Sequence, residues 1–127
     1  MRTRLVSSAL ALALFVSVVP ALIAADTAVQ RVIVVQTDDV NAYLKELDAA
    51  RAITKRLGGT SVIRVWRARF AGDSAGSFVV TIEYASMMAY AREEEKAQSD
   101  PEEQALLARL AKMRRILSDS LYTELKN

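Results

Sequence analysis

The chain has 127 residues and contains neither cysteine nor histidine. These absences exclude disulfides, a cysteine nucleophile and a Ser-His-Asp triad, and they remove the commonest general base, zinc ligand and haem ligand. The 17 basic and 15 acidic side chains nearly balance, so the net charge of +2 gives no electrostatic indication of nucleic-acid binding. We therefore expect no metal, no cofactor and no nucleic acid among the partners of this protein.

The first 25 residues have the three parts of a secretory signal peptide. Two arginines lie among the first four residues, residues 5–19 carry no charge, and a proline then precedes small and apolar residues up to Ala25. The sequence predicts cleavage near Ala25 and an exported protein, periplasmic or secreted, without a stable membrane anchor. An uncleaved anchor is the alternative, since residues 5–25 could just span a bilayer.

Residues 26–127 form the predicted mature domain, whose length suits one domain with one core. This part carries 15 basic and 15 acidic side chains, because both leader arginines are removed. Packing alone must hold the exported domain together, since it has no disulfide.

β-Branched runs, capping residues and helical spacings predict seven elements in the order β-α-β-β-α-α-β. In chain order, they are a strand at 29–36, a helix from Val40 to Leu57, strands at 62–70 and 77–84, a helix from 87 to about 98, a helix beginning at Pro101 and a strand within 116–125. A hairpin loop of six residues, 71–76, joins the two middle strands.

Local signals define the ends of the helices. Residues 37–39 offer capping oxygens to the first helix, and Gly58-Gly59 ends it. Ser86 caps the second helix. Asp100 caps the third, and Glu103 is expected to complete a capping box with it.

This order suits a four-stranded antiparallel sheet with helices on one face, an α+β fold of the ferredoxin-like, split βαβ type. Such a sheet leaves its other face open, and an apolar open face must be buried by a partner or a ligand. With a loop of six residues, Trp66 pairs with Thr81 and Arg64 pairs with Glu83, so these four residues share the open face. A slip by one residue would exchange the two faces.

The open-face residues have two interpretations. Trp66 offers a flat surface and one donor beside the Arg64–Glu83 ion pair, and with Thr81 and Tyr122 they would bind an apolar or aromatic molecule carrying a carboxylate. Alternatively, Trp66 is the anchor of a dimer interface, and the ion pair is a surface pair that contributes under about 1 kcal/mol.

The element order over residues 29–127 resembles the dimeric α/β-barrel superfamily, which includes antibiotic-biosynthesis monooxygenase-like and NIPSNAP-like domains. The stretch from Glu83-Tyr84-Ala85-Ser86 through Tyr90-Ala91 to Ser99-Asp100-Pro101-Glu102 is typical of such domains. The resemblance implies a homodimer in which two sheets pack their open faces into an eight-stranded barrel, with a cavity in each half. It implies functions from cofactor-free oxygenation and haem degradation to ligand binding. Without histidine, the chain departs from the haem-degrading members.

We therefore predict an exported homodimer that binds a small apolar or aromatic molecule in a cleft of the sheet, lined by Arg64, Trp66, Thr81, Glu83 and Tyr122. A cofactor-free oxygenase or isomerase is the alternative, with Glu83 and Tyr122 as its acid–base candidates. A structural dimer without a ligand is the second alternative. No sequence motif indicates a catalytic residue.

Overall fold

The computed structural model describes residues 27–127, so the predicted leader and its cleavage site lie outside the described residues. The elements are β1 (Val29–Gln36), α1 (Val40–Arg56), β2 (Val62–Arg67), a 3-10 turn (Gly72–Ser74), β3 (Phe78–Tyr84), α2 (Met87–Ser99), α3 (Pro101–Met113) and β4 (Arg115–Thr123). The predicted order of helices and strands is confirmed.

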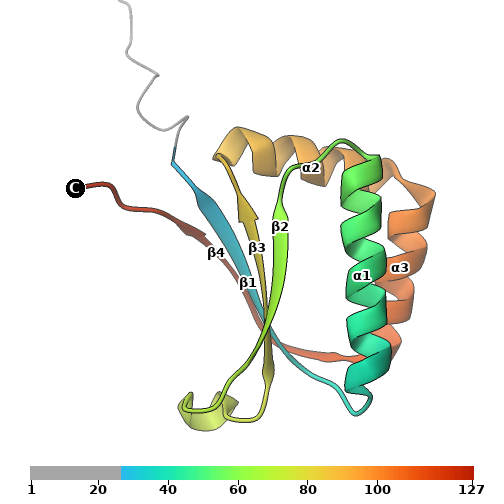
Figure 1. Cartoon of the computed structure of the whole chain (residues 1–127), viewed down its shortest axis with the longest axis vertical. Coiled ribbons are helices and arrows are strands. Elements are labelled where there is room, and N and C mark those ends of the chain that lie inside the picture. Colours follow the sequence, from blue (N-terminus) through green and yellow to red (C-terminus); the bar gives the residue numbers. More distant parts are fainter. Residues whose placement is uncertain (1–26) are drawn as a thin grey trace, which may run out of the picture.

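The four strands form one antiparallel sheet in the order β2-β3-β1-β4. The three helices lie on one face of this sheet (Figure 1). The chain therefore has the predicted ferredoxin-like α+β fold, with the other face of the sheet open. No helix within residues 27–127 is both long and apolar enough to cross a bilayer.

The helix ends follow from their capping residues. Asp39, Ser86 and Asp100 each accept a hydrogen bond from the backbone N–H three residues further along the chain. At the end of α1, the N–H groups of Gly58 and Gly59 return to the last turn in a Schellman motif. Gly58 has a φ of +77°, a conformation that favours glycine.

The core lies between the sheet and the helices. Helical spacing brings apolar residues of α1 and α3 onto the inward-pointing residues of β1 and β3. The buried cluster consists of Ile33, Val35, Tyr43, Leu47, Ile53, Phe78, Val80, Leu106 and Leu110.

The hairpin between β2 and β3 pairs two residues away from the predicted register. Trp66 lies opposite Val79 rather than opposite Thr81, and the second predicted pair is displaced by the same amount. The predicted loop is too short, because β2 ends at Arg67 and the fully exposed Phe70 belongs to the loop. A shift by two residues leaves every side chain on its predicted face, since strand residues alternate between faces.

The edge strand β4 is exposed along nearly its whole length, and Figure 1 shows it running away from the helices toward the C-terminus. A β-bulge at Leu117 of β4, opposite Val34 and Val35 of β1, interrupts the pairing of these two strands. The exposed large apolar side chains of β4 are Ile116, Leu117, Leu121 and Tyr122. The strand predicted within 116–125 is therefore confirmed with an earlier start, but the helices do not cover it.

Candidate functional site

Four of the predicted site residues meet on the open face of the sheet. Arg64 donates from Nη1 to Oε2 of Glu83 at 3.0 Å, and Trp66 donates from Nε1 to Oγ1 of Thr81 at 3.0 Å. Both contacts are diagonal, because the register places each partner two residues away from the opposed position. The polar groups of these four side chains are thus paired with one another.

Tyr122 lies on the same face but on the edge strand β4. Gln30 of β1 pairs with Glu83 on one side and with Tyr122 on the other, so one residue separates the two. A solvent-open hollow of about 420 Å³ lies beside Glu83 and Tyr122. Ligand binding by the five residues stays a prediction.

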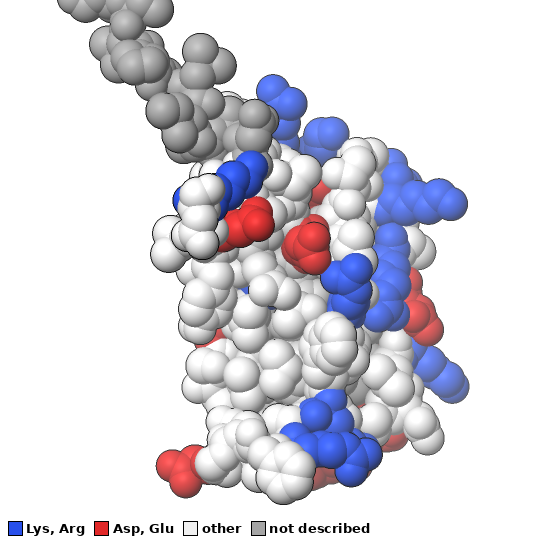
Figure 2. Space-filling view, turned by 60° about the vertical axis from the view of Figure 1, so that its left-hand side comes forward, with Lys and Arg blue, Asp and Glu red and all other residues white. Residues whose placement is uncertain are grey.

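The open face presents apolar surface between these polar pairs. Trp66 and Tyr122 are 54% and 57% exposed, and Val62 at the start of β2 is 44% exposed. In Figure 2 the middle of this face is mainly uncharged, with charged side chains gathered toward its ends and borders. A large exposed patch of this kind is typical of a protein–protein contact.

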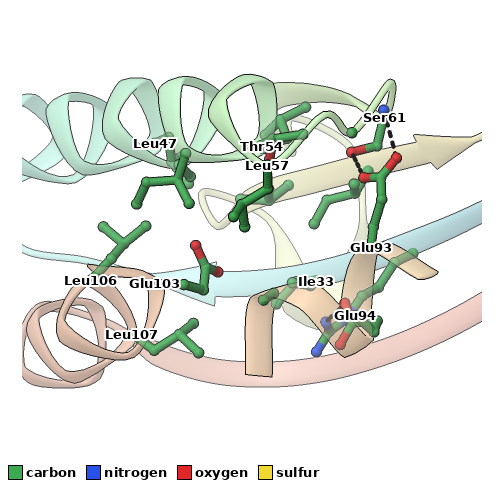
Figure 3. A pocket seen from close by; sticks show the side chains of 18 of the residues that line it. Ile33, Leu47, Thr54, Leu57, Ser61, Glu93, Glu94, Glu103, Leu106 and Leu107 are labelled. Atoms are coloured by element: carbon green, nitrogen blue, oxygen red, sulfur yellow. Dashed lines mark hydrogen bonds and ion pairs between the residues drawn. The ribbon is translucent and has the colours of Figure 1, made fainter. Parts of the chain in front are cut away.

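A cavity of about 130 Å³ lies on the other face of the sheet, beneath the helices. Leu47 of α1, Leu57 directly after α1, and Leu106 and Leu107 of α3 surround it (Figure 3). The charged side chains in its lining are Arg31, Glu93, Glu94, Lys96, Glu103 and Arg114. An apolar space with a few ionisable groups is the usual character of a small-molecule site.

Both carboxylate oxygens of Glu93 in this lining accept hydrogen bonds. Its Oε1 accepts from the backbone N–H groups of Thr60 and Ser61 at 2.9 and 3.2 Å, and its Oε2 accepts from the Ser61 hydroxyl. Gly59 makes room for this group, since a Cβ there would lie 2.8 Å from Cδ of Glu93. Glu93 therefore has a structural role, which ties α2 to the loop after α1.

Arg31 of β1 connects the cavity to the edge strand. Its Nε and Nη2 donate to the two carboxylate oxygens of Asp119 at 2.9 and 2.7 Å, and its Nη1 donates to Glu94 at 3.4 Å. The hydrogen bond from Arg31 lowers the pKa of Asp119 below its usual range. Burial raises the pKa of the neighbouring Tyr84, so its hydroxyl stays protonated.

Glu103 differs from the other acidic residues of the lining, because its carboxylate has no hydrogen-bond or ion-pair partner among the described residues. Figure 3 shows it pointing into the space between α1 and α3, toward Leu47 and Leu57. Burial raises its pKa, and the negative charges of Asp100, Glu94 and Glu102 raise it further.

The predicted capping box is therefore only half formed. The backbone N–H of Glu103 donates to Asp100 Oδ2 at 2.9 Å, as expected. The Glu103 carboxylate does not return to the backbone of Asp100, whose N–H instead donates to Ala97 at 3.2 Å. The end of α2 has taken the donor that a capping box needs.

Sequence reasoning missed this residue, although a signal for it exists. Glu103 precedes Leu106, Leu107 and Leu110 by three, four and seven positions, so it lies on the inward stripe of α3. A carboxylate on an apolar stripe is costly to bury, which points to either a partner or a function.

Arg114 lines the cavity from the far end of α3. Its Nη1 donates to the Tyr43 hydroxyl at 3.3 Å, and its buried Nε has no acceptor. It lies eleven positions after Glu103, which corresponds to about 16 Å along the helix axis. The two groups therefore mark opposite ends of the region.

No cluster of acidic side chains within residues 27–127 has the arrangement of a metal site.

Solved structures with the same fold include proteins of two families. The chain is similar to a NIPSNAP family protein from Agrobacterium tumefaciens, with 20% identity and a TM-score of 0.59 over 80% of this chain and 85% of that one. It is also similar to SnoaB, a cofactor-independent oxygenase from Streptomyces nogalater, with 16% identity and a TM-score of 0.60 over 80% of this chain and 96% of that one.

A third similar structure is a conserved protein of unknown function from Bacteroides thetaiotaomicron, described as a possible oxidoreductase. It shares 11% identity at a TM-score of 0.53, over 79% of this chain and all of that one. No protein-family model and no curated protein matches the sequence. The comparisons confirm, at the level of the fold, the predicted resemblance to NIPSNAP-like and monooxygenase-like domains.

Proposed function

We propose that this protein is an exported homodimer that binds a small apolar or aromatic molecule in the cavity between its sheet and its helices. The observation that carries the proposal is an apolar cavity into which the unpaired carboxylate of Glu103 points. The sequence-based prediction placed the ligand on the open face. We favour the helix side, because the polar groups of Arg64, Trp66, Thr81 and Glu83 are already paired with one another.

The size of the cavity supports a ligand of about one aromatic ring. Its volume of about 130 Å³ is close to that of an engineered apolar cavity of roughly 150 Å³ that takes up benzene. Leu47, Ile53 and Leu106 supply buried apolar walls. Filling such a space recovers dispersion contacts that an empty cavity lacks.

The open face supports the homodimeric part of the proposal. Trp66 and Tyr122 are large, amphipathic and more than half exposed, which suits anchors of a protein interface. A second copy of the sheet would cover both aromatic side chains, and with them the exposed strand β4.

A cofactor-free oxygenase or isomerase is the second candidate. Glu103 favours it, because a carboxyl group with a raised pKa in an apolar cavity can take up a proton from a bound substrate. The earlier acid–base candidates fit less well, since Glu83 is paired with Arg64 on the exposed face. Oxygen-dependent turnover of electron-rich phenols or hydroquinones would select this candidate over a binding protein.

Calorimetric titration with toluene tests the binding proposal. We expect saturable binding of one toluene per chain, and loss of this binding in Ala50→Leu, because Ala50 lines the cavity and a larger side chain would fill it. Ala52→Leu is the matched control, since Ala52 is exposed on the same helix and lies outside the lining. Toluene binding that survives Ala50→Leu unchanged would contradict the proposed site.

Mass spectrometry of the native protein from the exported fraction tests export and the dimer. The proposal expects a mass of two chains, each beginning near Asp26. A single chain, or a chain that keeps its first 25 residues, would contradict the corresponding part of the proposal.

A further inference from the structure

We propose that the cavity selects molecules that carry a protonated amine on an apolar body of about one ring, and that Glu103 is the acceptor of that amine. This inference rests on the proposed binding site and adds the chemical class of its ligand. The starting observation is that the three carboxylates lining the cavity differ in how fully they are hydrogen-bonded or ion-paired.

Only one of these carboxylates is available to a ligand. Glu93 accepts three hydrogen bonds from Thr60 and Ser61. Glu94 has the long contact with Arg31. Glu103 has no partner among the described residues and points between α1 and α3 (Figure 3).

The surroundings of Glu103 favour a cation. The charges that act on it most are those of Asp100, Glu94 and Glu102, all of which are negative. Arg56 is paired with Asp100 and Glu102, which leaves Glu94 as the other acid near Glu103. The remaining nearby cations do not reach Glu103, since Arg31 holds Asp119 and Lys96 donates to the Leu57 carbonyl at 3.1 Å.

Three kinds of ligand can be ranked by what they do to this carboxylate. An apolar molecule would displace water from Glu103 and leave the carboxylate without a hydrogen-bond donor, which is unfavourable. A ligand carboxylate would add a like charge. An ammonium group supplies both a positive charge and donors, and a hydrogen bond between charged groups is among the strongest available.

Arg114 does not reverse this ranking for a ligand of one ring. It follows the last residue of α3, whereas Glu103 lies in the first turn, so about 16 Å of helix separates them. A ligand of this size therefore reaches one group or the other. A ligand with a carboxylate in place of the amine tests directly whether Arg114 binds an anion.

The experiment compares the affinities of benzylamine, toluene and benzoate at pH 7 for the wild type, Glu103→Gln and Glu95→Gln. These three ligands share one ring and differ in charge. Glu95→Gln is the matched control, because Glu95 is exposed on α2 and does not line the cavity.

We expect the wild type to bind benzylamine at least about tenfold more tightly than toluene, since a hydrogen bond to a charged group contributes roughly 1.5–3 kcal/mol. Glu103→Gln should remove this preference and leave toluene binding intact. Glu95→Gln should change none of the affinities.

Benzylamine that binds the wild type no more tightly than toluene would overturn the inference while leaving the binding site in place. Tighter binding of benzoate than of benzylamine would also overturn it, in favour of Arg114. Failure of all three ligands to bind would instead remove the proposed function. If Glu103→Gln also failed to bind toluene, the relative affinities of benzylamine and toluene for the wild type would still decide whether the cavity prefers an amine.

Discussion

On the open face of the sheet, Arg64 is paired with Glu83 and Trp66 with Thr81, whereas beneath the helices the carboxylate of Glu103 has no partner among the described residues. The open face is broad and apolar with satisfied polar groups. The helix side holds a cavity whose lining has two unsatisfied groups, the Glu103 carboxylate and Nε of Arg114. A surface of the first kind suits another protein, and a space of the second kind suits a small molecule. The comparison therefore supports placing the proposed dimer interface on the open face and the proposed ligand site beneath the helices.

The largest effect is expected on stability, when a buried residue beneath the helices is truncated. Leu106 is completely buried and lines the cavity. Leu106→Ala should lower the free energy of unfolding by about 2–5 kcal/mol, because it removes buried contacts and enlarges the void. Urea denaturation measures this change. Leu107→Ala should cost much less, because this side chain lies at the edge of the same cavity and is 42% exposed. Equal losses would contradict the difference in burial between the two leucines.

The next effect concerns the open face. Trp66→Ala should weaken the proposed dimer by roughly 30-fold or more, since an aromatic anchor of an interface contributes about 2 kcal/mol. Sedimentation equilibrium measures the dissociation constant. Phe70→Ala is the control, because Phe70 is fully exposed in the hairpin loop. A dimer that tolerates the loss of Trp66 would assign the interface to another surface.

A smaller effect concerns the pair that joins the cavity to β4. Asp119→Asn should lower stability at pH 7 by about 1 kcal/mol, because it removes the carboxylate that Arg31 holds through two hydrogen bonds. The pKa of Asp119 is lowered in the folded state, so its contribution is present above its usual pKa and is lost as the pH falls through the lowered value. Thermal melts should therefore converge for the variant and the wild type at acid pH. A constant difference down to the lowest pH would contradict the ion pair.

The smallest expected effect is a gain in thermal stability. Glu103→Gln should raise the melting temperature at pH 7 by at most about 4 °C. The raised pKa of Glu103 means that the folded chain is most stable below the usual glutamate pKa and loses stability as the pH rises through the raised value. The variant cannot ionise, so its advantage should vanish near pH 4. A lower melting temperature for Glu103→Gln at pH 7 would show that the carboxylate stabilises the fold.

Local signals in the sequence were sufficient to predict the order of the elements and the caps of the helices. Asp39, Ser86 and Asp100 act as N-caps, and Gly58-Gly59 ends α1, because each depends on neighbouring residues alone. The face of Trp66 was also predicted correctly, although the hairpin register was wrong, because an error of two residues preserves the alternation.

The cavity could not be predicted in the same way, since it depends on how three helices pack on the sheet. The position of Glu103 after Asp100 fitted a capping box, which is a local interaction. The last turn of α2, another local contact, instead takes the Asp100 N–H for the Ala97 carbonyl, and the Glu103 carboxylate points toward α1. In the sequence, only the helical spacing of Glu103 with Leu106 and Leu110 indicated that its side chain faces inward.

The most direct test of the division between the two faces is a toluene titration followed by NMR, observing the methyl groups and the indole N–H of Trp66. Binding on the helix side predicts shifts at Leu47, Ile53 and Leu106, with the Val62 methyl groups and the Trp66 indole unchanged. Shifts confined to Val62 and Trp66 would place the ligand on the open face and contradict the proposed site.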